Sequence, residues 1–168
     1  MEELSQKHRF TSIQEIKDKL NKEITTCTST LKKYQKAYNV INTISITSGT
    51  LAGGSAIITT SSISNPIISL PTACISAILG SITLVTGVWN KILLKKIEKY
   101  EQYLSIGQSK LNSIEIKLSQ STDDNTISAE EFLTCMNIYE SYNKMKQDIR
   151  IKYKLKNLNM KKTKKSKQ

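Results

Sequence analysis

The residues that could perform chemistry are few and widely spaced. The chain holds one histidine, His8, and three cysteines, Cys27, Cys74 and Cys135, with no short spacing between any two of them. An odd number of distant cysteines predicts neither a disulfide framework nor a zinc knuckle. The sequence contains no Gly-rich phosphate loop, nucleophile elbow or zinc-protease motif. We therefore expect no enzyme activity, no catalytic residue, no cofactor and no small-molecule substrate.

The segment from Gln120 to Glu131 resembles a calcium-binding EF-hand loop in outline. Glu131 stands where the last, bidentate carboxylate of such a loop would be, and Ile127 where its central hydrophobic residue would be. Asp124 offers one more carboxylate, but Asn125 replaces the glycine and too few acids remain to hold the ion. A capped turn between two helices is the favoured interpretation.

The charges of the chain leave one long gap. Lysine and arginine number 25 against 14 acids, a net charge of +11, yet no charged residue occurs from Ala37 to Asn90. This block has two halves, residues 40–62 and 70–90, each with about the 20 residues that cross a hydrocarbon core of ~30 Å. The turn signal Ser64-Asn65-Pro66 separates them. We expect residues 40–90 to form an apolar helical hairpin that enters a membrane.

The two halves differ in polarity. The first carries many Ser and Thr, whose hydroxyls can bond back to the helix backbone in lipid or line water in an oligomer. The second, in which Pro71 suits the first helical turn, carries the residues expected to insert into lipid: Ile75, Ile78, Leu79, Ile82, Leu84, Val85, Val88 and Trp89. Small residues spaced four apart are expected to let the two helices pack closely, and they are Gly49, Gly53, Ala73, Ala77 and Gly80.

Amphipathic helices flank the apolar block. Residues 12–39 begin with the capping box Ser12-x-x-Glu15, and apolar residues recur at helical steps from Ile13 onward. Residues 91–118 repeat the pattern from Leu93 to Leu118. Because the two seams match in length and period, we expect these helices to run antiparallel, side by side.

A third helix follows, over residues 126–156. Ser128-x-x-Glu131 is a second capping box. The apolar residues behind it are Phe132, Cys135, Tyr139, Tyr142, Met145 or Lys146, and Ile149. Residues 1–11 are expected to be flexible and residues 157–168 to be a disordered basic tail. The fold class is therefore all-α: a long antiparallel helical hairpin with an apolar, membrane-inserting tip, a third helix that packs back as a three-helix bundle, and a basic tail.

Lysines border the apolar block on both sides, whereas the link between its halves has no charge. The positive-inside rule then places both termini on the cytoplasmic side of a membrane. Anionic lipid headgroups are the expected partners of Lys32, Lys33, Lys36, Lys91, Lys95, Lys96 and Lys99. The alternative is a solvated helix face, and the basic tail could equally neutralise nucleic-acid phosphates.

The order of these features resembles a family of small hydrophobic-hairpin proteins of invertebrate genomes, many of them in virus-like mobile elements of the Polinton/Maverick type. The resemblance covers roughly residues 30–155 and rests on three segments. These are Tyr34-Gln35-Lys36, the Lys91–Lys99 exit with Glu98 and Tyr100, and Asn125-Thr126-Ile127-Ser128-x-x-Glu131-Phe132. It implies a membrane-associated protein of a virion or mobile element and supplies no catalytic residue.

The sequence thus predicts a non-enzymatic integral membrane protein that acts through its helical hairpin as a structural or interaction module. Two alternatives stay open: a membrane-perturbing, pore-forming α-helical protein, and a nucleic-acid-condensing protein that acts through the basic tail. Assembly into a homo-oligomer is open as well.

Overall fold

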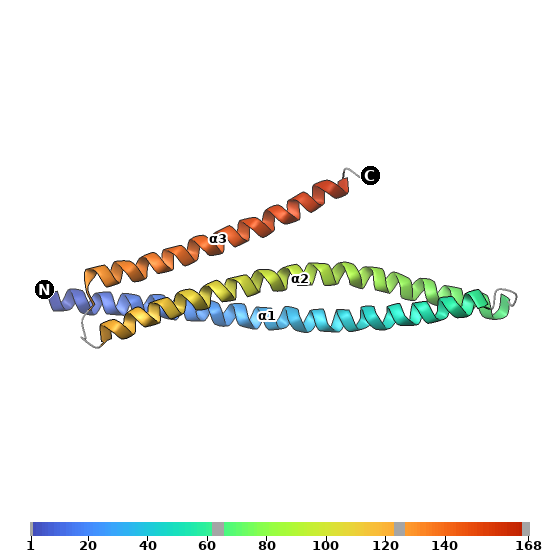
Figure 1. Cartoon of the computed structure of the whole chain (residues 1–168), viewed down its shortest axis with the longest axis horizontal. Coiled ribbons are helices and arrows are strands. Elements are labelled where there is room, and N and C mark those ends of the chain that lie inside the picture. The colour runs from blue at the N-terminus through green and yellow to red at the C-terminus, as the bar shows by residue number, and fades with distance from the viewer. Residues whose placement is uncertain (1, 62–65, 123–126, 166–168) are drawn as a thin grey trace. The chain divides into compact units, whose positions relative to one another are not determined.

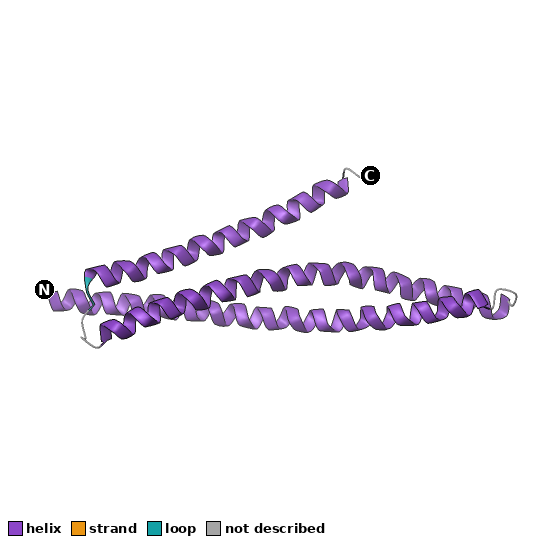
Figure 2. Ribbon diagram, viewed as in Figure 1, coloured by secondary structure: helices purple, strands orange, loops and turns teal. Residues whose placement is uncertain are grey.

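Three long helices make up the part of the chain that the computed structural model describes, residues 2–61, 66–122 and 127–165 (Figure 1). Helix α1 spans Glu2–Ser61, α2 spans Pro66–Thr122 and α3 spans Ala129–Lys165, and these ranges contain no strand (Figure 2). Helix α1 packs against α2, and α3 packs back on them. The predicted all-α class, with its third helix returning to the first two, is confirmed.

The chain divides into two compact units. The bundle unit comprises Met1–Leu31 and Lys99–Gln168, and the hairpin unit comprises Lys32–Glu98. The hairpin unit holds the uncharged block and the lysines at its edge, whereas the bundle unit holds most of the charged residues and all of α3.

Apolar side chains from all three helices form the core of the bundle unit. Leu20 of α1 and Ile114 of α2 are both 0% exposed, and Cys135 and Tyr142 of α3 complete the same cluster. Burying one Leu or Ile side chain stabilises a fold by about 1.5–3 kcal/mol. The buried positions are those of the predicted seams, joined by three that lie outside these seams: Tyr103, Ile127 and Tyr153.

The N-terminus of α3 is fixed by the predicted capping box. The backbone N–H and the hydroxyl of Ser128 both donate to the Glu131 carboxylate at 2.9 Å, and the backbone N–H of Glu131 donates to the Ser128 hydroxyl at 3.2 Å. These bonds satisfy donors that the first helical turn leaves without partners. Helix α3 accordingly begins at Ala129 rather than at residue 126.

Other predicted helix boundaries differ from the structure. Helix α1 begins at Glu2, so Ser12 lies within the helix and does not cap it. Helix α3 continues to Lys165, through most of the segment expected to be a disordered tail. Both extensions run through sequence without Pro or Gly, the residues that most strongly end a helix. Helix α2 begins at Pro66, so Pro71 lies inside it, and Pro66 takes the first position, where the missing N–H costs nothing.

Gly107 of α2 is the one glycine of the bundle core, and its lack of a side chain lets the neighbouring helices pack closely against it. A Cβ at this position would lie 3.0 Å from Cγ1 of Ile24 in α1 and 3.7 Å from Cε2 of Tyr142 in α3. Three helices therefore meet at a point where only a hydrogen atom fits without a shift.

We expect Gly107→Leu to lower the free energy of unfolding by about 1–3 kcal/mol, because the added side chain overpacks this contact. Urea unfolding of the detergent-solubilised chain, followed by circular dichroism, measures the change. Ser105→Leu, at an exposed position of the same helix, is the matched control and should change stability by less than about 0.5 kcal/mol. Equal effects of the two substitutions would contradict the contact.

Candidate membrane-insertion site

The outer surface of the hairpin unit is apolar. Leu84 is 75% exposed and Ile57 is 70% exposed, one on each helix. Of the eight residues expected to insert into lipid, seven are exposed large hydrophobic residues and Leu79 is half-buried. Helix α1 adds a comparable set of exposed apolar side chains, which are Val40, Ile44, Ile46, Leu51, Ile57 and Ile58.

The contact between the two helices of this unit is polar along the uncharged block, whereas Leu93 and Ile97 toward the charged end are apolar and buried. The hydroxyl oxygens of Ser48 and Thr83 lie 3.1 Å apart and those of Ser55 and Ser76 lie 2.6 Å apart. Thr59 donates to the hydroxyl of Thr72 at 2.8 Å. We call these three hydrogen-bonded pairs the hydroxyl ladder. Ser48 is the one polar residue among the described residues whose side chain is buried.

The ladder keeps one antiparallel register. Each step along α1, from Ser48 to Ser55 to Thr59, is matched by an equal step back along α2, from Thr83 to Ser76 to Thr72. Steps of seven and four residues return to the same face of a helix. The pairs therefore lie on one straight seam, and Asn90 Nδ2 donates to Asn42 Oδ1 at 3.2 Å toward the charged end of that seam.

Small residues contribute less to this contact than the sequence suggested. Gly49 does lie against α2, since a Cβ there would be 3.6 Å from Cγ2 of Thr83. A Cβ at Gly53 or Gly80 would meet no atom within 4 Å, so neither glycine lies at a close contact between the two helices of the hairpin. Ala73 and Ala77 are likewise exposed rather than packed against α1. Short hydroxyl side chains, not glycines, occupy the contact.

The hydroxyls that face outward bond to their own helix. Thr43 donates to the carbonyl of Asn39 at 2.9 Å, and Thr50 donates to that of Ile46 at 2.9 Å. Thr86 and Ser81 of α2 bond in the same way, four residues back along the chain. Such bonds satisfy a hydroxyl where no water is present. The outward Ser and Thr residues thus do not conflict with an apolar surrounding.

One helix of the described chain is long and apolar enough to cross a membrane. It is α2 from Leu70 onward, where the most apolar stretch has a mean hydropathy of 1.7 and is 0% buried. The apolar part of α1, residues 40–61, is not such a helix on length and composition.

The lysines at the edge of the block gather at the charged end of the hairpin unit. Lys32, Lys33, Lys36, Lys91 and Lys96 are exposed and Lys95 is half-buried. Lys96 Nζ lies 5.0 Å from the ring centre of Tyr34, which joins α2 to α1 at this level. Lys99 belongs to the bundle unit, where its Nζ lies 5.4 Å from the ring centre of Tyr103.

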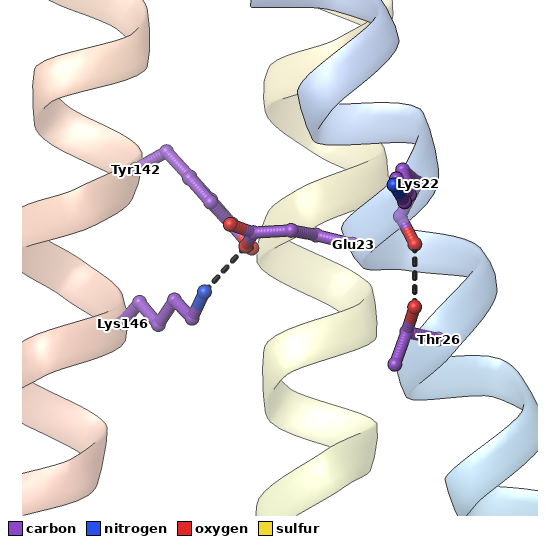
Figure 3. A network of polar contacts seen from close by, with 5 residues as sticks. All are labelled: Lys22, Glu23, Thr26, Tyr142 and Lys146. Atoms are coloured by element: carbon purple, nitrogen blue, oxygen red, sulfur yellow. Dashed lines mark hydrogen bonds and ion pairs between the residues drawn. The ribbon is translucent and has the colours of Figure 1, made fainter.

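A polar network in the bundle unit was not foreseen from the sequence. Tyr142 of α3 donates to a carboxylate oxygen of Glu23 in α1 at 2.7 Å, and Lys146 forms an ion pair with the same oxygen (Figure 3). Burial alone would raise the pKa of Glu23, but the hydrogen bonds from Lys146 and Tyr142 and the charge of Lys146 outweigh it and lower the pKa. Of the two candidates Met145 and Lys146, it is Lys146 that faces the other helices, while Met145 is exposed.

The network borders a shallow groove of about 430 Å³ between α1 and α3. Its lining includes Cys27, whose pKa burial raises, so this cysteine is a neutral thiol rather than an activated nucleophile. The pKa of Cys135 is raised by burial too. The other residues of the lining are Lys19, Lys22, Glu23, Thr26, Tyr139 and Lys146.

The loop that resembles an EF-hand lies only partly in the described chain, because Asp124 and Asn125 fall outside it. Glu131 uses its carboxylate to cap α3, and Ile127 is buried in the core. Within residues 2–61, 66–122 and 127–165 no cluster of three His, Cys, Asp or Glu side chains is placed to hold a metal ion.

Comparisons of the chain with protein-family models, curated proteins and solved structures give no match. The most distinctive feature of the described chain is the hairpin unit, with its apolar outside and hydrogen-bonded hydroxyls inside.

The register of the hydroxyl ladder predicts a specific cross-link. In a chain whose three native cysteines are replaced by Ser, Ser55→Cys with Ser76→Cys should form an intrachain disulfide under mild oxidation, because these side chains already touch. Ile57→Cys with Ile75→Cys is the control, since both side chains point outward. Mobility on non-reducing gels measures the reaction. Faster cross-linking of the control pair would contradict the register.

Stability of the bundle unit should depend on pH through Glu23. A carboxyl group with a lowered pKa contributes stability above its unfolded value of 4.5, and this contribution disappears as the pH falls below the folded pKa. Tyr142→Phe should cost about 1 kcal/mol at pH 7 and less at an acidic pH below the lowered pKa of Glu23, where its carboxyl group is protonated. Urea unfolding at both pH values measures the effect. Tyr139→Phe, whose ring stacks on Tyr142, is the control and should show no such pH dependence.

Proposed function

We propose that this protein is a non-enzymatic integral membrane protein whose hairpin unit inserts into the lipid bilayer and holds the bundle unit at the membrane surface. Its role is that of an anchor and interaction module. Both termini then lie on the cytoplasmic side, because the lysines border the block at one end and the opposite link carries no charge.

The polarity of the hairpin unit is the observation that supports this proposal. A water-soluble helical hairpin buries its apolar residues and exposes its polar ones. Here Leu84, Ile57 and Ile78 are exposed, whereas Ser48, Ser55 and Thr59 hydrogen-bond between the helices. Lipid favours this arrangement, because polar groups need partners inside the protein while apolar groups do not.

The same observation weakens the pore-forming alternative. That alternative drew on the Ser- and Thr-rich first half, whose hydroxyls could line water in an oligomer. Three of those hydroxyls instead bond to α2 within one chain, and others bond to their own helix. The nucleic-acid alternative rests on the basic residues after Leu155, whose side chains lie outside the described set.

Charges placed on the apolar surface should prevent insertion. We expect Ile75→Asp, Ile78→Asp and Leu84→Asp together to make the protein extractable from membranes by alkaline carbonate, because an aspartate within the bilayer costs about 2.5–3.5 kcal/mol. The wild-type chain should stay in the membrane pellet. Immunoblotting of pellet and supernatant measures the distribution.

The bundle unit offers a matched control. Ile116, Leu133 and Ile151 are exposed apolar residues at 58%, 59% and 46%, and the same three changes to Asp there should leave the protein in the pellet. Release of the wild-type chain, or equal release of both variants, would refute insertion through the hairpin unit.

A further inference from the structure

We propose that the charged end of the hairpin unit is a binding collar for acidic phospholipid headgroups, so that the protein selects the leaflet richer in anionic lipid. The collar comprises Lys32, Lys33, Lys36, Lys91, Lys95 and Lys96. This inference rests on the proposed insertion of the hairpin and adds to it a class of lipid and a site.

The lysines occupy one level of the hairpin. The register of the ladder, continued toward the charged end, sets Lys36 opposite Lys95 and Val40 opposite Lys91, and the Lys96–Tyr34 contact agrees with it. At 1.5 Å per residue the six lysines then fall within a band of roughly 12 Å along the helix axes. The headgroup layer of one leaflet, with the reach of a lysine side chain, is of similar depth.

The lysines point in different directions around the pair of helices. Neighbouring residues of a helix differ by about 100°, so Lys33 leaves α1 on a different side from Lys32 and Lys36. Lys96 likewise leaves α2 on a different side from Lys91 and Lys95. Five of the six are exposed and Lys95 is half-buried. A single bound anion would require lysines that converge. Lysines that diverge around an inserted hairpin instead face the ring of headgroups that surrounds it, which favours a lipid surface over a nucleic acid lying along one face.

Little negative charge offsets the collar. Glu98 is the one acidic residue in Lys32–Glu98, against six lysines, which leaves the unit at +5. Aromatic residues accompany the lysines: Trp89 is 54% exposed and Tyr38 is half-buried, as is typical where a protein passes from lipid to headgroups. A basic residue near an anionic membrane surface improves binding roughly fivefold.

The test is cell-free synthesis of the full chain with lipid vesicles, either neutral phosphatidylcholine or phosphatidylcholine with 30% phosphatidylserine. The lipid concentration that gives half-maximal carbonate-resistant insertion is measured. We expect the wild-type chain to need at least ~100-fold less of the anionic vesicles, and this preference to shrink in 0.5 M salt. Changing the six collar lysines to Gln should remove the preference but leave insertion into neutral vesicles unchanged.

A control variant removes the same charge from the bundle unit. Its six positions are exposed lysines changed to Gln, which are Lys7, Lys19, Lys22, Lys144, Lys152 and Lys154, and it should retain most of the preference. Equal insertion of the wild-type chain into both vesicles, or an equal loss in both variants, would overturn the collar while leaving the hairpin anchor intact. Failure of the wild-type chain to insert into either vesicle would refute the anchor, and the collar with it.

Discussion

The hairpin unit depends on one constraint: every hydroxyl and amide in an uncharged block must find a partner within the protein. Ser48, Ser55 and Thr59 find theirs across the helix contact, and Thr43 and Thr50 find theirs one turn back on their own helix. Unbroken helices likewise provide hydrogen-bond partners for the backbone N–H and C=O groups. Among the described residues of the block, Asn90 Oδ1 is the exception, a buried oxygen without a hydrogen-bond partner. With the other polar groups named here satisfied inside, the remaining outward surface can consist of Ile, Leu and Val.

The two units use the same spacing with opposite polarity. In the bundle unit, residues at steps of three and four along the seams are apolar and buried, as Leu20 and Ile114 are. In the hairpin unit, the residues at those steps over the uncharged block are Ser, Thr and Asn, as the Asn42–Asn90 pair and the hydroxyl ladder demonstrate, whereas Leu93 and Ile97 beyond the block are apolar and buried. One periodicity therefore joins helices in both units, while the polarity of the seam changes where the uncharged block begins.

Properties that follow from local spacing could be predicted from the sequence. Helical seams, the capping box at Ser128 and the uncharged block all depend on residues close together in the chain. The boundary at Ser12 was wrong because a cap motif competes with a sequence that favours continued helix in both directions. The hydroxyl ladder and the Glu23–Tyr142 bond were missed because each joins distant residues, and only the register between helices decides which hydroxyls or charges meet.

The hydroxyl ladder determines the register of the two helices more than it adds to the stability of the hairpin. Hydrogen bonds between helices in a membrane contribute about 0.6 kcal/mol each on average, so the three pairs add little stability. A shift of α2 by one residue would lose all three pairs at once, while Ser48, Ser55 and Thr59 would keep the bonds that each can also make to a carbonyl of its own helix. The register is therefore favoured because only one alignment brings all three pairs together. This explains how a contact with few glycines and few large apolar residues can still be specific.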